Sequence, residues 1–203
     1  DTSRLAGRDR AVVDQTVAEL RQLDVGGWMG EEFRGERIPL LSEVLATIPE
    51  GRRLFVEIKS GAEILPALGR TFEEAGLGGE KVTIIGFGFE TMAAAKRAFP
   101  GIPVYWISRK APQPSGDADP ARDALIAKAK SAGLDGLHLQ AWDTIDARFV
   151  RAVKSAGLDL VVWTVDDAAD ARRLAAAGVD GITTNRPGRL RSGLGSTIAA
   201  RRL

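Results

Sequence analysis

Two charged residues, Glu57 and Lys59, stand two positions apart in the short, mostly apolar run 54–59. The run is typical of a β-strand, and strand side chains alternate in direction, so Glu57 and Lys59 should share one face with Phe55. Apolar residues at the alternate positions also predict a strand buried on both faces, as in a parallel sheet. A carboxylate and an ammonium in such a place need partners or a function, because unpaired buried charge is costly.

Two interpretations of this pair follow from its chemistry. The two side chains could neutralise each other as a structural ion pair. At the carboxyl end of a barrel strand, the carboxylate of Glu57 could instead bind a metal ion while the ammonium of Lys59 binds a phosphate oxygen. The Val-Glu-Ile-Lys pattern alone does not decide between them.

Several aromatic residues are further candidates for a site. Trp163 lies near the end of a predicted strand, where it could form an aromatic wall for a substrate or pack in the core. Trp106 allows the same two interpretations, and Phe87 is interpreted as a core residue. Trp28 and Phe33 lie in a glycine- and charge-rich segment, where they could line an entrance or form the core of a small subdomain.

Composition excludes several classes of site. The chain has no cysteine, which excludes disulfides, thiol catalysis and thiolate zinc sites but does not decide the cellular compartment. The net charge is +1 with basic and acidic residues well mixed, so no patch for nucleic acid is predicted. No apolar run is long enough to span a bilayer. The single histidine, His138, lies in an apolar strand and is typical of a structural histidine.

A short phrase, Ala-Gly-(Leu/Val)-Asp, begins at residues 132, 156 and 177, and residues 74–77 form a looser copy. Each copy follows an amphipathic segment and precedes an apolar run. The phrase therefore predicts a helix that ends at its glycine, a short turn, and then a strand. The repetition indicates strands alternating with helices.

The whole chain can be divided on this basis. Strands are expected near 54–59, 82–87, 103–107, 136–140, 159–165 and 180–184. Helices are expected near 62–75, 90–98, 119–132, 145–156, 167–177 and 187–192, and earlier near 15–23 and 40–48. Asp166 and Asp167 are expected to start one of these helices. Six such units form either a doubly wound sheet or most of a (β/α)8 barrel, and the absence of a Gly-x-Gly-x-x-Gly or P-loop motif weighs against a nucleotide-binding open sheet.

Five motifs follow one another in an order typical of one family. They are Leu23-Asp24-x-Gly26-x-Trp28, Gly35-Glu36-x-Ile38-Pro39-x-Leu41-x-Glu43-Val44-Leu45, Val56-Glu57-Ile58-Lys59, Trp163-Thr164-Val165 and Gly181-Ile182-Thr183-Thr184-Asn185-Arg186-Pro187. Together they resemble the glycerophosphodiester phosphodiesterases over essentially the whole chain. The resemblance implies a (β/α)8 TIM barrel that hydrolyses glycerophosphodiesters to sn-glycerol 3-phosphate and an alcohol with a divalent metal.

The resemblance also implies roles for particular residues. Glu57 would be a carboxylate ligand of the metal, and oxygen ligation suits Ca²⁺ or Mg²⁺. Lys59 would hold a non-bridging phosphate oxygen, and Trp163 would line the substrate. The excursion near 24–40, within the insertion segment 10–48, would cap the barrel mouth. The partner of this site would be a small-molecule phosphodiester.

The positions at which the chain departs from the family are as informative as those that match it. The family's active site needs His-Arg-Gly, Glu-x-Asp and His-Asp, and none of these is present, so no catalytic histidine is assigned in this chain. Residues 1–7 resemble the segment that comes directly after His-Asp in the family. We therefore expect one partial barrel domain over 1–203 that lacks the first two βα units. Gly86 and Asn185 are smaller departures, since the family usually has Ser and often Asp there.

Three functions stay open from the sequence. The first is the phosphodiesterase itself, of which this chain is a part. The second is a non-catalytic barrel that binds phosphate esters or a partner. The third is a sphingomyelinase-type lyase on the same fold, which also needs two histidines. Neither the oligomeric state nor the alcohol head group is determined by the sequence.

Overall fold

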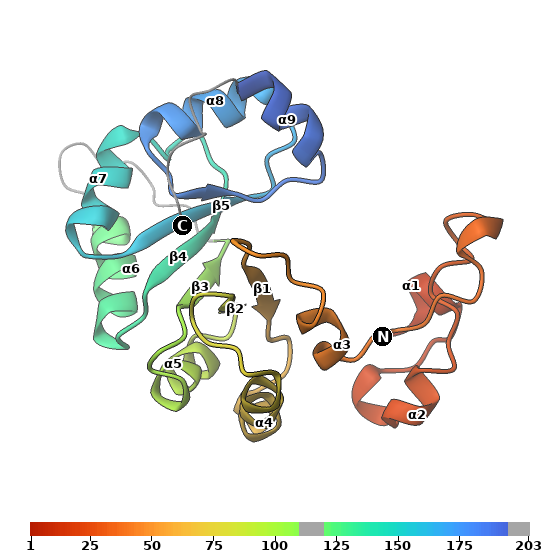
Figure 1. Cartoon of the computed structure of the whole chain (residues 1–203). Coiled ribbons are helices and arrows are strands. Elements are labelled where there is room, and N and C mark those ends of the chain that lie inside the picture. Colours follow the sequence, from red (N-terminus) through yellow and green to blue (C-terminus); the bar gives the residue numbers. More distant parts are fainter. Residues whose placement is uncertain (110–119, 195–203) are drawn as a thin grey trace. The chain divides into compact units, whose positions relative to one another are not determined.

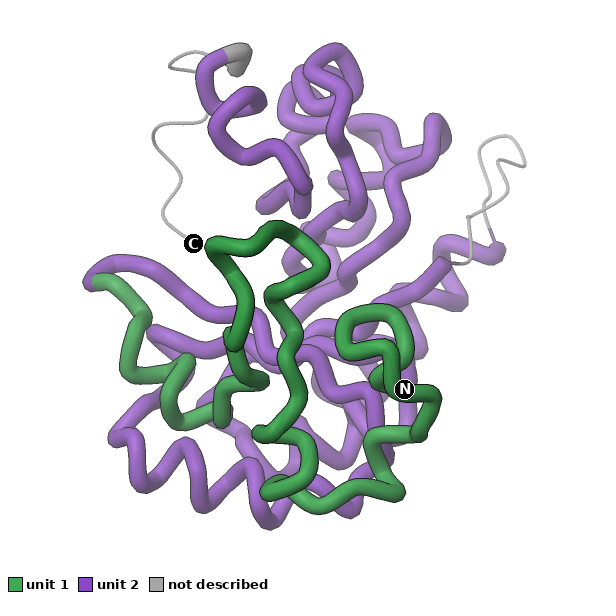
Figure 2. Tube along the Cα trace, turned by 90° about the vertical axis from the view of Figure 1, so that its right-hand side faces the viewer, with its two compact units in different colours: residues 1–49 green, residues 50–203 purple. Residues whose placement is uncertain are grey.

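The computed structural model describes residues 1–109 and 120–194. The chain divides into two compact units, Asp1–Pro49 and Glu50–Leu203 (Figure 2). The first unit is made of short helices and turns. The second contains all the strands of the parallel sheet.

The first unit holds five short helical segments, α1 (Ser3–Ala6), η1 (Val12–Asp14), α2 (Val17–Leu20), η2 (Glu31–Phe33) and α3 (Leu41–Leu45). The helices expected over 15–23 and 40–48 are therefore present but shorter. The chain turns after α2 because the Asp24 carboxylate accepts hydrogen bonds from the backbone N–H groups of Gly26, Gly27 and Gly35, at 2.9, 2.9 and 3.0 Å. These bonds fold the segment after α2 back on itself.

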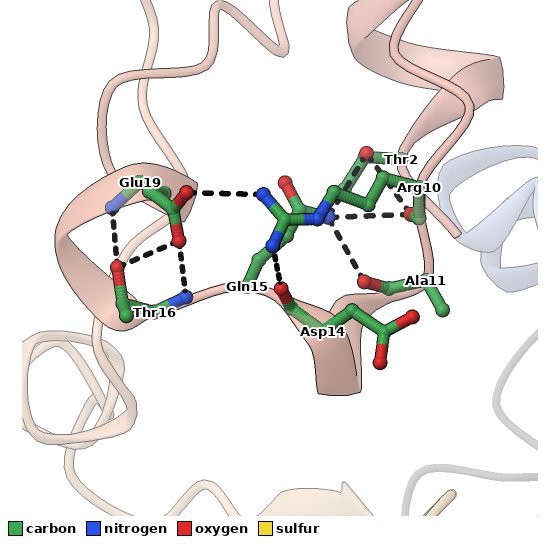
Figure 3. A network of polar contacts seen from close by, with 7 residues as sticks. All are labelled: Thr2, Arg10, Ala11, Asp14, Gln15, Thr16 and Glu19. Atoms are coloured by element: carbon green, nitrogen blue, oxygen red, sulfur yellow. Dashed lines mark hydrogen bonds and ion pairs between the residues drawn. The ribbon is translucent and has the colours of Figure 1, made fainter.

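Polar contacts join the start of this unit (Figure 3). Arg10 forms an ion pair with Glu19 at 3.0 Å and also donates to the Asp14 carbonyl. Glu19 closes a capping box with Thr16 at the start of α2. Hydrogen bonds from the Thr16 backbone and side chain, followed by the contact with Arg10, lower the pKa of Glu19 to about 2. The Gln15 amide donates to Thr2 Oγ1 and to two backbone carbonyls, so α2 is tied to the first residues of the chain.

The aromatic residues of this unit do not form its core. Trp28 is 59% exposed and Phe33 39% exposed, and the Trp28 indole donates only to the nearby Val25 carbonyl at 2.9 Å. The expectation of a small aromatic core is therefore wrong. The first unit is stabilised mainly by turns, helix caps and ion pairs, which glycine and charged residues form.

The second unit contains six parallel strands in the order of the chain (Figure 1). They are β1 (Leu54–Glu57), β2 (Val82–Gly86), β3 (Val104–Ser108), β4 (Gly136–Gln140), β5 (Asp159–Trp163) and β6 (Gly181–Ile182). A doubly wound sheet would reverse the strand order, and this sheet does not. The strands therefore form a partial barrel of the TIM type, as expected.

Helices alternate with these strands. They are η3 (Ala62–Ile64), α4 (Leu65–Ala75), α5 (Phe89–Ala98), α6 (Pro120–Ser131), α7 (Ala147–Ser155), α8 (Ala168–Ala177) and α9 (Pro187–Leu194). The expected helices are thus confirmed within a few residues, apart from residue 119, which lies outside the described residues. The glycines of the repeated phrase stand just after α4, α6, α7 and α8 with φ between 61° and 97°, the left-handed conformation that ends a helix. No helix in the described ranges combines the length and apolar character needed to cross a membrane.

Two aspartates of the repeated phrase, Asp135 and Asp180, form hydrogen bonds and ion pairs with the strand and helix that neighbour them. Asp135 accepts the Val104 N–H at 2.8 Å and pairs with Lys96 of α5 at 2.8 Å. Asp180 likewise accepts the Leu160 N–H at 3.0 Å and pairs with Lys154 of α7 at 2.5 Å. Each of these two carboxylates therefore joins the start of the preceding strand to the helix that comes before that strand.

The two faces of the sheet differ. The outer face packs under the helices, with α5 against β2 and β3 and α7 against β5 (Figure 1). Its fully buried side chains are Val82, Ile84, Val104, Leu137, Leu139, Leu160 and Val162. A methyl group at Gly86 would lie 2.6 Å from Met92 Cε of α5, so this departure from the family permits close packing of α5.

The inner face is only partly covered. Ile85, Tyr105, Ile107 and Val161 form a buried cluster on it. Phe55 of β1, in contrast, is 36% exposed. The expectation that β1 is buried on both faces is therefore wrong. Within the described part β1 is an edge strand that pairs only with β2.

The end of β5 also differs from expectation. The strand stops at Trp163 and β6 has two residues. Just beyond them the Val165 N–H still donates to the Thr183 carbonyl at 3.0 Å, and side-chain hydrogen bonds hold the residues that follow. Asp166 accepts from the Thr184 hydroxyl and the Asn185 backbone, both at 2.8 Å, and from Asn185 Nδ2 at 2.9 Å. Asp166 thus fixes the loop after β6, while Asp167 alone caps α8.

Replacing Asp167 with alanine should weaken α8. Its carboxylate accepts the N–H groups of Ala169 and Asp170 at 2.7 and 3.0 Å, and loss of such a cap costs about 1 kcal/mol. Urea denaturation of Asp167→Ala should show this decrease in the free energy of unfolding. Asp167→Asn keeps a capping oxygen and should stay near the parent value; an equal loss in both variants would argue against the cap.

Candidate active site

The carboxyl ends of the six strands meet at one edge of the parallel sheet. Along this edge the inner-face positions hold Glu57 at the end of β1 and Lys59 just after it, Phe87 after β2, Arg109 after β3 and Trp163 at the end of β5. Alternation carries each side chain to the inner face, since Ile85, Ile107 and Val161 of the inner cluster stand two residues earlier. These five residues form the strand-end cluster.

Glu57 and Lys59 lie close together but are not buried. Lys59 Nζ is 3.6 Å from Glu57 Oε2, and the two side chains are 79% and 31% exposed. The pair is therefore not a dry ion pair in the core. An ion pair exposed to this degree contributes about 0–1 kcal/mol. Both charges face the solvent at the carboxyl edge, where a ligand could reach them.

Trp163 combines packing with exposure. Its indole N–H donates to the His138 carbonyl at 3.1 Å, and its ring packs against the inner cluster. The Phe87 ring meets it edge to face, with centroids 5.8 Å apart. The Trp163–Thr164 peptide bond is cis. Trp163 is thus held on three sides and leaves part of its ring at the strand-end edge.

The Trp106 ring points away from the inner face, although its indole N–H donates to the Phe87 carbonyl at 3.0 Å. It points to the opposite face of β3 from Tyr105 and Ile107, and its ring contacts Phe89 of α5, with centroids 5.1 Å apart. Lys128 of α6 lies 5.2 Å from the Trp106 ring centroid. Trp106 therefore packs among the helices outside the sheet and does not line the site.

Phe87 and Arg109 were not predicted as site residues. Phe87 is 42% exposed, so its interpretation as a core residue is wrong. The Arg109 guanidinium carbon lies 5.1 Å from the Phe87 ring centroid and 5.7 Å from that of Trp163. The sequence feature that could have identified Arg109 is strand alternation, which places it on the same face as Tyr105 and Ile107.

His138 lies on the inner face below this edge. Its Nε2 atom is 3.0 Å from Thr183 Oγ1, and its Nδ1 atom has no hydrogen-bond partner among the described residues. The ring is buried and meets Phe55 and Trp163 edge to face. Burial lowers the pKa of His138 to about 4, so the imidazole is neutral near pH 7. This environment agrees with a structural histidine.

This burial predicts a pH dependence of stability. The unfolded chain has a histidine pKa near 6.5, so between pH 6.5 and 4 the unfolded state binds the proton that the folded state excludes. The contribution of His138 should therefore lower the free energy of unfolding by about 3 kcal/mol as the pH drops through that window. Above pH 6.5 the titration of His138 should no longer change the stability. Carboxylates with lowered pKa values, such as Asp166 and Asp167, add their own losses at lower pH.

The His138→Gln variant separates these contributions, because glutamine does not titrate and can still bond to Thr183. Denaturation of the parent and the variant at several pH values between 4 and 7 gives the difference. We expect the gap between the two stability curves to change across the window. Parallel curves would contradict the assignment of a neutral buried imidazole.

The fit to a divalent cation is partial. Ca²⁺ and Mg²⁺ prefer six or more oxygen ligands, and Glu57 alone can supply at most two. Among residues 1–109 and 120–194, no three His, Cys, Asp or Glu side chains gather closely enough to hold an ion. The described part of the chain therefore offers one carboxylate of suitable chemistry, and a complete site needs further oxygen ligands.

Comparisons with known proteins identify relatives of this chain. The model of the "Glycerophosphoryl diester phosphodiesterase family" matches residues 1–189. A glycerophosphodiester phosphodiesterase of Caldanaerobacter subterraneus subsp. tengcongensis is 33% identical over 181 residues, which cover 87% of this chain and 70% of that protein. YhdW of Bacillus subtilis is 32% identical over 101 residues, covering 48% of this chain and only 41% of its own length.

A solved structure resembles the fold. A phosphodiesterase of Oleispira antarctica, in complex with the product sn-glycerol-3-phosphate, superimposes with a TM-score of 0.81 at 24% identity. The match covers 95% of this chain and 75% of that one. At this identity the likeness is one of fold. The 203 residues thus span only part of the length of the proteins they resemble.

Proposed function

The chain belongs to the glycerophosphoryl diester phosphodiesterase family, and from this we propose that the complete protein hydrolyses glycerophosphodiesters to sn-glycerol 3-phosphate and an alcohol with a divalent cation. The observation that carries the proposal is that Glu57 and Lys59 lie 3.6 Å apart at the carboxyl edge of the sheet. Active sites of barrel enzymes lie at this edge. The Oleispira relative, with its bound sn-glycerol-3-phosphate, supports the identity of the product.

The proposal includes the architecture of the complete protein. The six strands would be the third to eighth strands of a (β/α)8 barrel, with two further βα units contributed by residues outside these 203. Two facts support this: the strands follow chain order, and the chain covers 70–75% of a relative and of a solved structure that it matches. In such a barrel β1 would gain a second neighbour.

The residues of the strand-end cluster suit this chemistry. Glu57 would be one oxygen ligand of Ca²⁺ or Mg²⁺, which when bound polarises the phosphate. Lys59 Nζ would bind a non-bridging phosphate oxygen and stabilise the negative charge that grows there in the transition state. Because their charged groups are 3.6 Å apart, the two would act on one phosphate. The exposed part of Trp163 would line the glycerol or the alcohol head group.

Proton transfer needs other groups. His138 is buried, neutral and bonded to Thr183, so it is unsuited to exchange protons with a substrate at the edge. A general acid and base must reach within hydrogen-bond distance of the reacting oxygens. In this proposal both come from the two additional βα units, as the family's histidines would.

The test is turnover by the complete protein. Glycerophosphocholine is the substrate, and release of sn-glycerol 3-phosphate is measured by a coupled enzyme assay. Turnover should disappear with EDTA and return with Ca²⁺ or Mg²⁺. Turnover that persists in EDTA would overturn the metal dependence. Binding of the diester without turnover would favour a non-catalytic phosphate-ester-binding barrel instead.

A further inference from the structure

Arg109 places a positive charge in the strand-end cluster that the proposed reaction does not use. We propose that Arg109 selects glycerophosphodiesters whose alcohol part carries a negative charge, such as a carboxylate, and disfavours cationic choline esters. The inference rests on the proposed function and adds the class of head group. It assigns Arg109 as a specificity-determining residue.

The position of Arg109 is fixed from two sides. The guanidinium carbon lies 5.1 Å from the centroid of Phe87, which follows β2, and 5.7 Å from that of Trp163, which ends β5. The two rings are nearly perpendicular, at 89°, with centroids 5.8 Å apart. Cation–π attraction of this kind holds a charged head group over an aromatic face. The charge of Arg109 is therefore kept beside Trp163, the ring proposed to line the substrate.

The charge of Arg109 has no acidic partner within the described part of the chain. Lys59, by comparison, has Glu57 at 3.6 Å. Stacking uses the face of the guanidinium and leaves its in-plane N–H donors available. These donors match the two oxygens of a carboxylate or phosphate. Arg109 is thus prepared to bind an anion rather than to stabilise a neighbouring element.

The aromatic pair explains the selection against choline. Two rings meeting at a right angle are the kind of surface that binds a quaternary ammonium group. Here the guanidinium of Arg109 already lies over both rings. The positive charge of Arg109 would repel a second cation at this place and would attract an anion.

The experiment uses the complete protein and two substrates that differ by one carboxylate. Glycerophosphoserine and glycerophosphoethanolamine share the ammonium group, and only the serine ester carries the additional anion. The parent should have the higher kcat/KM for the serine ester. In Arg109→Gln the serine-to-ethanolamine ratio of kcat/KM should fall about tenfold, the scale of one hydrogen bond to a charged group. The Arg109→Lys variant keeps the charge but loses the planar pair of donors. Its serine-to-ethanolamine ratio should lie between those of the parent and Arg109→Gln.

Lys128 provides the matched control. Its ammonium lies 4.2 Å from the Phe89 ring centroid and 5.2 Å from that of Trp106, a similar stacked cation on the outer side of the sheet. Lys128→Gln should leave the ratio unchanged. An equal loss for both substrates in Arg109→Gln, with the ratio unchanged, would overturn the selection and indicate a role in packing or in binding the shared phosphate. Failure of the parent to hydrolyse any glycerophosphodiester would overturn the proposed function, and this inference with it.

Discussion

Replacing Glu57 with glutamine in the complete protein should lower metal-dependent turnover of glycerophosphocholine by about 10²–10³-fold or more. The amide keeps the size of the side chain but removes the negative charge that would hold a divalent cation, and the loss of one preorganised electrostatic contact costs this much. Stability should change by less than about 1 kcal/mol, because the Glu57–Lys59 pair is exposed. Metal-titrated kinetics and thermal melts measure the two effects.

Lys59→Ala is the matched comparison. It removes the other member of the pair and should lower kcat while leaving the metal affinity largely intact, since Lys59 would contact phosphate rather than the cation. If the two residues formed only a surface ion pair, both variants would instead keep normal turnover and normal metal dependence, with a loss of stability of at most about 1 kcal/mol. That result would defeat the functional assignment of Glu57 and Lys59.

The 203-residue polypeptide by itself should hydrolyse glycerophosphocholine at least about 10²–10⁴-fold more slowly than the complete protein. Loss of one general acid–base residue has an effect of this size, and the chain's single histidine, His138, is buried and neutral. The edge strands β1 and β6, which each have one neighbour in the described sheet, should also favour aggregation.

The measurement requires a polypeptide of verified mass. Turnover is assayed on protein confirmed at 21.7 kDa by intact-mass spectrometry, in parallel with the complete protein at equal concentration. Size-exclusion chromatography of the same sample tests for aggregation. Substantial turnover by the 21.7 kDa species would contradict the prediction and require an acid–base group within these residues.

The alternation of strands and helices was readable from the sequence because local chemistry repeats. Each copy of the Ala-Gly-(Leu/Val)-Asp phrase ends a helix with a glycine in the left-handed conformation, and the apolar run that comes after it forms the next strand. These signals act within a few residues of one another. The sequence did not reveal that Asp135 and Asp180 each bind the strand before them, since those contacts cross 20 to 31 residues.

Two departures from the family acquire a physical reason from the structure. Gly86 makes room for Met92 of α5, because a Cβ atom at this position would lie 2.6 Å from Met92 Cε and that side chain would have to shift. Asn185 donates its amide to Asp166, a bond that a second carboxylate at this position could not make. Neither reason is visible in the sequence, because Met92 and Asp166 are brought to these residues only by the fold.

The charged residues at the end of β1 and the face that they share could be predicted from the sequence, because strand alternation is a local property. The sequence also indicated the family, through motifs that lie far apart along the chain. The exposure of Glu57 and Lys59, the place of Phe87 outside the core, and the stacking of Arg109 beside Trp163 became known only from the fold. Burial and cation–π contact depend on which strands become neighbours and on how fully each face is covered, and both are set by the packing of segments distant in sequence.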